Sequence, residues 1–219
     1  MKFARSSFQP RESRASRLAR ARICGVTPDH SAPALLDLVE RMIDGGVDMV
    51  QLRHKTMGRG ALFDLARQVA ERCAQAEVLL IVNDHVDICA ESGADGVHVG
   101  SDDLSIAGAR AVLGPEFLIG ATAATLALVR SAQKAGADYI GAGPAFVTRI
   151  KPDRPIIGPV GIAALAATVD LPVFAIGGID PGGLAQLRTA GVDRVCAITA
   201  FSGPNTVEVA RGFREELRS

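Results

Sequence analysis

The stretch Gly46-Val47-Asp48-Met49-Val50-Gln51-Leu52-Arg53 decides the fold, because its first three residues form a phrase that recurs along the chain. The phrase places a glycine where a helix must end and an aspartate just before an apolar strand begins. Its four copies stand 47, 43 and 55 residues apart, which is too long for one strand and one helix and suits two of each. The copies lie at 46–48, 93–95, 136–138 and 191–193 and precede MVQLR, GVHVG, YIGAG and RVCAI.

Four more apolar runs lie between these copies, so the pattern predicts eight strands alternating with helices. The runs are ARICGVT near the start, VLLIVND at 78–84, FLIGAT at 117–122 and PVFAIGG at 172–178. Near-continuous apolar strands are typical of a parallel sheet that is covered on both faces. We therefore predict an α/β protein with a single (β/α)₈ TIM barrel over residues 23–219.

A doubly wound open sheet uses the same units and is the alternative fold. It would usually carry a glycine-rich dinucleotide fingerprint after the first strand. The sequence there reads VTPDHSAPALL, which has no such glycines.

Length and composition restrict the kinds of protein that this chain can be. A chain of 219 residues that is 48% hydrophobic is long enough for one large domain. Its 24 basic and 24 acidic residues balance, so nothing favours nucleic acid or a membrane surface as a partner. No apolar run approaches the roughly 18 residues that a membrane span needs. Homo-oligomer formation stays open.

The four cysteines stand far apart in apolar stretches and show no C-x-x-C spacing. This usage is typical of buried thiols in a reducing compartment, so we expect a cytoplasmic protein without disulfides.

The first 22 residues differ from the rest, because seven basic residues interleaved with serines are opposed only by Glu12. We expect residues 1–22 to form a flexible basic tail. A short amphipathic helix and an organelle transit peptide are the alternatives for this composition.

Cationic side chains follow the second strand. In eight-stranded barrels the active site lies at the carboxyl ends of the strands, so polar residues there are the candidates. Arg53 and Lys55 are two residues apart on an extended segment and can point the same way, toward one polyanion. A solvated strand end is the alternative for this pair.

Two carboxylates follow the third and fourth strands. Asp84 and Asp103 can approach one point from adjacent strands, where a divalent ion would relieve their repulsion. Hard oxygen ligands beside a phosphate group are how Mg²⁺ is usually held, so we expect Mg²⁺ as the cofactor. For Asp103 the alternative is an ordinary helix N-cap before LSIAGARAVL.

A glycine pair ends the seventh strand, in AIGGI, and a helix is expected from about Pro181. Glycines let backbone N–H groups approach an anion, and the loops after strands seven and eight form the recurrent phosphate site of such barrels. Gly177 and Gly178 therefore predict a phosphate site; a tight turn without a ligand is the alternative.

Several motifs together resemble the thiamine phosphate synthase family over residues 23–218. The resemblance implies transfer of a hydroxymethylpyrimidine unit from its diphosphate to a thiazole phosphate, giving thiamine phosphate and pyrophosphate. The motifs that carry it, in chain order, are QLRHK, ND, HVGSDDL, GPAFVTRIK, AIGGI and IT.

The resemblance also implies roles for individual residues. Arg53, Lys55, Thr122 and Lys151 would be catalytic, and Asp84 and Asp103 would bind Mg²⁺. The residues implied to hold the pyrimidine diphosphate are Gln51, Arg53, Lys55, Asn83, Thr122 and Lys151. Those implied to hold the thiazole phosphate are Thr148, Gly178, Ile198 and Thr199. Leu52, His54, Arg149 and Ile150 stand within these motifs and are assigned to substrate binding with them.

The chain departs from the family pattern at three positions, where Ile150 replaces a threonine, Ser101 a glutamine and Ala124 a histidine. These departures keep two other functions open. One is a thiazole tautomerase, which depends on a histidine after strand five that this chain lacks. The other is a paralogue that binds phosphorylated ligands without turnover or with another substrate.

Overall fold

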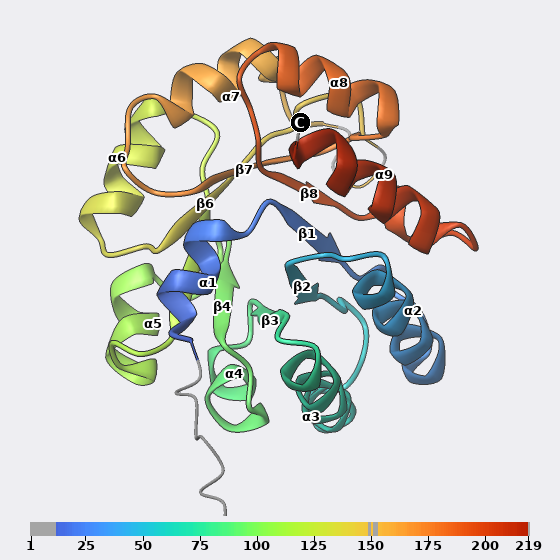
Figure 1. Ribbon diagram of the computed structural model, residues 1–219. Helices are drawn as coiled ribbons and strands as arrows, with labels where there is room; N and C mark the ends of the chain where they lie inside the picture. The colour runs from blue at the N-terminus through green and yellow to red at the C-terminus, as the bar shows by residue number, and fades with distance from the viewer. Residues whose placement is uncertain (1–11, 149, 151–152, 219) are drawn as a thin grey trace, which may run out of the picture.

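The computed structural model describes residues 12–148, 150 and 153–218 and shows a closed parallel barrel (Figure 1). Each strand pairs with its neighbours in sequence, and β8 closes the barrel against β1. The predicted (β/α)₈ barrel is confirmed. The strands are β1 (Ile23–Val26), β2 (Met49–Leu52), β3 (Leu79–Asn83), β4 (Gly96–Val99), β5 (Leu118–Thr122), β6 (Tyr139–Ala142), β7 (Val173–Ile176) and β8 (Val195–Ala197).

Helices follow the strands in turn and surround the barrel. A 3₁₀ turn, η1 (Thr199–Phe201), precedes the last helix. In the described part of the chain, none of the helices has the length and apolar character to cross a membrane. The surrounding helices are α2 (Ala32–Asp44), α3 (Arg59–Gln75), α4 (Val86–Ser92), α5 (Ile106–Leu113), α6 (Leu126–Lys134), α7 (Gly158–Ala166), α8 (Pro181–Thr189) and α9 (Thr206–Arg218).

The glycines of the recurring phrase end helices in a left-handed conformation. All four have φ between 84° and 89°, a region that residues with a Cβ rarely adopt. The four are Gly46, Gly93, Gly136 and Gly191.

Three aspartates of the phrase join neighbouring strands at the amino-terminal end of the barrel. The Asp48 carboxylate accepts a hydrogen bond from the Ile23 backbone N–H at 3.0 Å. Asp95 accepts one from the β3 backbone at 2.9 Å, and Asp138 one from the β5 backbone at 2.7 Å. In these three copies, the aspartate therefore links an even strand to the odd strand before it.

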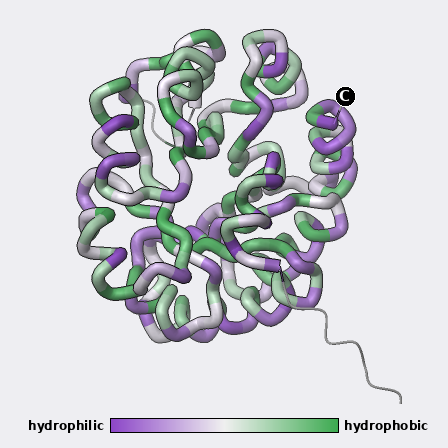
Figure 2. Tube along the Cα trace, turned by 60° about the vertical axis from the view of Figure 1, so that its left-hand side comes forward, coloured by the Kyte–Doolittle hydropathy of each residue, from purple (hydrophilic) through white to green (hydrophobic). Residues whose placement is uncertain are grey.

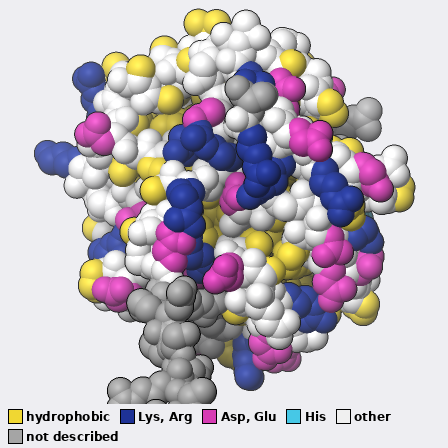
Figure 3. Space-filling view, viewed as in Figure 1, with side chains coloured by type: hydrophobic (Ala, Val, Ile, Leu, Met, Phe, Trp, Pro, Cys, Tyr) yellow, Lys and Arg dark blue, Asp and Glu magenta, His cyan; other side chains and the backbone are white. Residues whose placement is uncertain are grey.

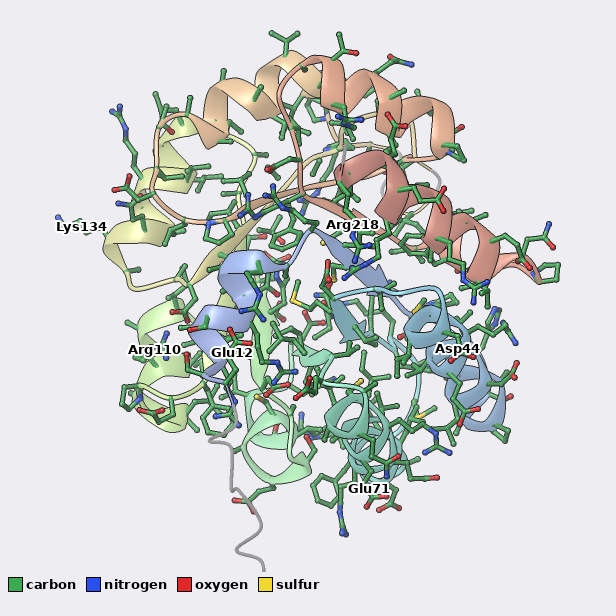
Figure 4. All side chains as sticks on the ribbon, viewed as in Figure 1. Glu12, Asp44, Glu71, Arg110, Lys134 and Arg218 are labelled. Carbon is green, nitrogen blue, oxygen red and sulfur yellow. The ribbon has the colours of Figure 1, made fainter. Side chains whose placement is uncertain are left out.

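The core has two layers, one between strands and helices and one inside the barrel. Hydrophilic residues gather on the outer turns of the helices (Figure 2), and Glu71 and Lys134 point away from the strands (Figure 4). The side chains that fill the barrel are Cys24, Val26, Met49, Leu79, Ile81, Leu118, Tyr139, Phe174 and Cys196, with Leu18 and Ala21 beneath them.

All four cysteines are buried and unpaired, as expected. Burial raises the pKa of Cys73 and of Cys89 to about 12, so both thiols stay protonated at neutral pH.

The prediction of a flexible tail over residues 1–22 needs correction. Residues 1–11 lie outside the described residues, but Arg14–Arg20 form helix α1, which crosses the amino-terminal end of the barrel. Leu18 is 3% exposed and completes the interior cluster. Arg14 and Arg17 both pair with Asp95, at 3.1 and 3.5 Å, among the mixed charges of this face (Figure 3). Buried apolar side chains and arginines that pair with Asp95 thus hold this segment, in agreement with the alternative of a short amphipathic helix.

We expect Leu18→Ala to lower the free energy of unfolding by about 2 to 4 kcal/mol, because it removes a buried side chain from the end of the barrel. Chemical denaturation measures the change. Leu128→Ala is the control, since Leu128 is 52% exposed and its loss should change stability by about 0.5 kcal/mol or less. Equal stability of the two variants would show that α1 does not contribute to the core.

Candidate active site

A cavity of about 540 Å³ opens at the carboxyl ends of the strands, at the opposite end of the barrel from α1. Residues from the ends of all eight strands, or from the loops that follow them, line it. The structure thus brings together most of the residues predicted for the site. Those that line the cavity are Gln51, Arg53, Lys55, Asn83, Asp84, Asp103, Thr122, Thr148, Ile150, Gly178, Ile198 and Thr199.

Two predicted residues do not reach the cavity, and two more cannot be placed. Leu52 is 1% exposed and packs between the strands and the helices, because alternate residues of a strand face opposite sides. His54 Nε2 lies 3.0 Å from the His30 carbonyl oxygen, and its Nδ1 accepts hydrogen bonds from the backbone N–H groups of Thr56 and Met57. The assignment of both to substrate binding is corrected. Arg149 and Lys151 lie outside the described residues.

Polar side chains form the floor of the cavity and bond to each other across neighbouring strands. Gln51 donates to Asn83 Oδ1 at 3.0 Å. His98 lies with Nε2 3.0 Å from Thr122 Oγ1 and with Nδ1 3.1 Å from the Tyr139 hydroxyl. Burial raises the pKa of Tyr139 well above its usual value, so this hydroxyl keeps its proton. The floor is therefore preorganised by contacts between strands.

The sequence places His98 in the HVGSDDL motif at the end of the fourth strand, but we gave it no role in the site. The signal was present, since His98 has the same inward phase on β4 that Gln51 has on β2.

Asp29 organises the cationic segment after β2. Its carboxylate accepts hydrogen bonds from Arg53 Nη1 at 3.2 Å and from the Lys55 backbone N–H at 2.7 Å. Partial burial raises the pKa of Asp29, but the Lys55 N–H and the Arg53 guanidinium more than offset this and hold it below its usual value. Thr27 exchanges two hydrogen bonds of 2.8 Å with the Arg53 backbone. Both cations are thus held at the cavity wall.

Asp84 stands at a strained position between β3 and α4. Its φ of 67° is left-handed, and its backbone N–H donates to the His98 carbonyl oxygen at 2.8 Å. Lys55 Nζ donates to Asp84 Oδ2 at 2.5 Å. A non-glycine residue held in this conformation is often found at functional sites.

Asp103 does not cap the following helix. Ser105 is the N-cap of α5 and accepts from the Gly108 N–H, whereas Asp103 Oδ2 accepts from the Gly100 N–H at 2.8 Å. The carboxylate therefore folds back to the end of β4 and lines the cavity.

The two carboxylates fit a divalent ion only together with other oxygen ligands. Within the described ranges, Oδ1 of Asp84 and Oδ1 of Asp103 take part in no hydrogen bond. The same part of the chain holds no cluster of three or more acidic, histidine or cysteine side chains that would suit a metal. Mg²⁺ usually takes one or two carboxylates with phosphate and water oxygens, and two aspartates beside a polyphosphate site suit that pattern.

A tight turn after β7 offers backbone donors to an anion. Gly177 and Gly178 have φ of 103° and 66°, and a Cβ on Gly178 would lie 2.2 Å from the Val147 carbonyl oxygen. Asp180 caps α8 by accepting from the Gly183 N–H at 2.7 Å, so the helix begins directly beyond the turn, as predicted. A helix amino terminus with glycines before it favours phosphate.

The closed barrel, with a cavity at the carboxyl ends of its strands, has the architecture of a (β/α)₈-barrel enzyme. A family model described as thiamine monophosphate synthase matches residues 23–201. The chain therefore belongs to the thiamine monophosphate synthase family, and the prediction made from the motifs is confirmed.

Individual relatives agree with this assignment. The bifunctional thiamine biosynthesis protein ThiM/ThiE of Symbiobacterium thermophilum is 42% identical over 198 residues, which cover 90% of this chain and 40% of that protein. A thiamine-phosphate synthase of Haloquadratum walsbyi is 40% identical over 169 residues, 76% of each chain. The solved structure of a thiamine phosphate pyrophosphorylase from Pyrococcus furiosus superimposes with a TM-score of 0.84 at 27% identity, covering 93% of this chain and 97% of that one.

Proposed function

We propose that this chain is a magnesium-dependent transferase that joins a hydroxymethylpyrimidine, supplied as its diphosphate, to a thiazole phosphate. The thiazole nitrogen forms a bond to the exocyclic pyrimidine carbon as the bond from that carbon to the diphosphate oxygen breaks. Thiamine phosphate and pyrophosphate are the products. The observation that carries the proposal is one cavity whose lining combines Arg53 and Lys55, the carboxylates of Asp84 and Asp103, and a glycine turn.

The cationic side of the cavity would hold the diphosphate. Arg53 offers a guanidinium fork and Lys55 a mobile ammonium, and both would stabilise the charge that develops on the leaving pyrophosphate. Asp84 and Asp103 would hold Mg²⁺, which when bound would neutralise further phosphate charge. On diphosphate binding, Lys55 would exchange its contact with Asp84 for one with a phosphate oxygen.

The floor of the cavity would hold the pyrimidine. Gln51 and Asn83 can donate and accept hydrogen bonds at ring nitrogens and the amino group, and Thr122 is held in place by His98. Lys151, by its sequence position, would reach the diphosphate from the loop after β6.

The opposite side would hold the acceptor. The Gly177–Gly178 turn and the start of α8 would bind its phosphate, with Thr148, Ile198 and Thr199 around them. The two substrates would then meet with the thiazole nitrogen against the pyrimidine carbon, so that positioning supplies much of the rate.

A direct assay tests the proposal. The purified chain is mixed with both substrates and Mg²⁺, and thiamine phosphate is measured with and without a chelator. We expect product only when Mg²⁺ is present. Binding of both substrates without product would favour a paralogue that binds its ligands without turnover, and rearrangement of the thiazole alone would favour a tautomerase.

We also propose a cytoplasmic location, which the four unpaired buried thiols support.

Ile150 stands in the cavity lining where the family pattern has a threonine. It lines the cavity and is 44% exposed, but it cannot donate the hydrogen bond that a threonine would. We expect Ile150→Thr to strengthen thiazole phosphate binding by about 0.5 to 1.5 kcal/mol and to leave pyrimidine diphosphate binding unchanged. Calorimetry with each substrate measures both effects. Tighter binding of the diphosphate instead would contradict this division of the loop between the two substrates.

A further inference from the structure

The loop between β6 and α7 is fixed at both ends beside the glycine turn. At its start, the Ala145 N–H donates to the Ile176 carbonyl oxygen at 2.9 Å and the Phe146 N–H to the Gly177 carbonyl oxygen at 3.0 Å. At its end, the Ile157 N–H donates to the Pro144 carbonyl oxygen at 2.9 Å. Residues just before 157 therefore lie close to the turn that the proposed function assigns to a phosphate.

Arg154 stands three residues before this end, is half-buried and lines the cavity together with the glycine turn. Its guanidinium has no hydrogen bond or ion pair with any other residue in the described ranges. The two cations on the opposite wall differ, because Arg53 pairs with Asp29 and Lys55 with Asp84. Among the described residues, Arg154 thus lines the cavity without a countercharge.

Among the described residues that line the cavity, Arg53 and Lys55 stand on the diphosphate side, which leaves Arg154 as the cation for the acceptor side. The residues assigned there to the thiazole phosphate are neutral, and the one carboxylate beside the turn, Asp180, is engaged in capping α8. A phosphate carries close to two negative charges at neutral pH, and burying such a charge among neutral groups alone is costly. An arginine fork matches phosphate oxygens in a bidentate way.

We propose that Arg154 binds the phosphate of the acceptor and makes the enzyme select a phosphorylated acceptor over the corresponding alcohol. This inference rests on the proposed function, because it assigns a residue to the acceptor subsite of that same cavity. Arg154 is singled out because it has no partner among the described residues and stands on a loop that is anchored to the glycine turn.

Calorimetry on Arg154→Gln tests the inference, with thiazole phosphate, thiazole alcohol and pyrimidine diphosphate as the three probes. We expect Arg154→Gln to weaken thiazole phosphate binding by at least about tenfold, because a charge-assisted contact is lost. Binding of the alcohol and of the diphosphate should stay within about twofold, since neither relies on this contact. Arg154→Lys should recover part of the loss. Arg130→Gln is the matched control, because Arg130 is an exposed arginine on α6 that does not line the cavity.

The possible results distinguish a wrong role for Arg154 from a wrong proposed function. If the unaltered protein makes thiamine phosphate but Arg154→Gln binds thiazole phosphate normally, the inference alone is wrong. An equal loss for phosphate and alcohol would show a structural role and would also overturn it, as would a loss confined to the diphosphate. If the unaltered protein neither binds thiazole phosphate nor makes product, the proposed function fails and the inference fails with it.

Discussion

Asp84→Asn is expected to lower kcat/KM for thiamine phosphate formation by at least about 100-fold at saturating Mg²⁺. The change removes an anionic oxygen from the proposed metal site beside the leaving diphosphate. Asparagine is the right replacement because Asp84 has a φ of 67°, and asparagine tolerates this left-handed conformation better than alanine. The fold should therefore persist. The assay is a Mg²⁺ titration of the rate, in which half-saturation should also shift to a higher concentration.

The control for this prediction lies one helical turn away. Asp87 carries a carboxylate on α4 that pairs with Arg59, is 60% exposed and does not line the cavity. Asp87→Asn should keep both the rate and the Mg²⁺ dependence. Asp103→Asn should behave like Asp84→Asn, since both carboxylates line the same cavity. An unchanged Mg²⁺ titration in either of these two variants would remove that residue from the metal site.

The barrel could be predicted because its signals are local. Each strand is a short apolar run, and each copy of the glycine-aspartate phrase marks a helix end and a strand start within a few residues. Helix α1 could not be predicted in the same way. Its place depends on Leu18 filling the end of a barrel built by the rest of the chain, and on arginines that pair with Asp95, far along the sequence.

Site residues on strands could be predicted, because side chains alternate between the two faces of a strand. Site residues on loops follow no such rule and were harder to predict. Gln51 and Arg53 line the cavity, as their spacing indicates, whereas Leu52 between them faces the helices. Asp29 was missed as the partner of the cationic segment, because its contacts with Arg53 and Lys55 join two loops that only the closed barrel brings together. Long-range contacts of this kind leave no periodic signal in one sequence.

Gly178→Ala is expected to weaken thiazole phosphate binding by about 100-fold, because the glycine turn cannot keep its position when residue 178 carries a side chain. An added Cβ would lie 2.2 Å from the Val147 carbonyl oxygen, so either the turn or the loop after β6 must move. A displacement of about 1 Å in a substrate-positioning element can cost about 100-fold in rate, and we expect a loss of similar size in affinity for the thiazole phosphate. Pyrimidine diphosphate binding, on the opposite wall, should change by less than about threefold. Calorimetry with each substrate measures the two affinities separately.

Replacing a left-handed glycine by alanine also lowers the free energy of unfolding by roughly 1 to 2 kcal/mol through backbone strain alone. Gly191→Ala separates the two effects, because Gly191 has a φ of 86° but no atom within 4 Å of an added Cβ, and it does not line the cavity. Both variants should lose a similar amount of stability to the strained φ, with an added loss in Gly178→Ala from the clash. Only Gly178→Ala should lose affinity for the thiazole phosphate. If both variants bound thiazole phosphate equally well, the glycine turn would serve the chain as a turn, and the acceptor phosphate would have to be held elsewhere in the cavity.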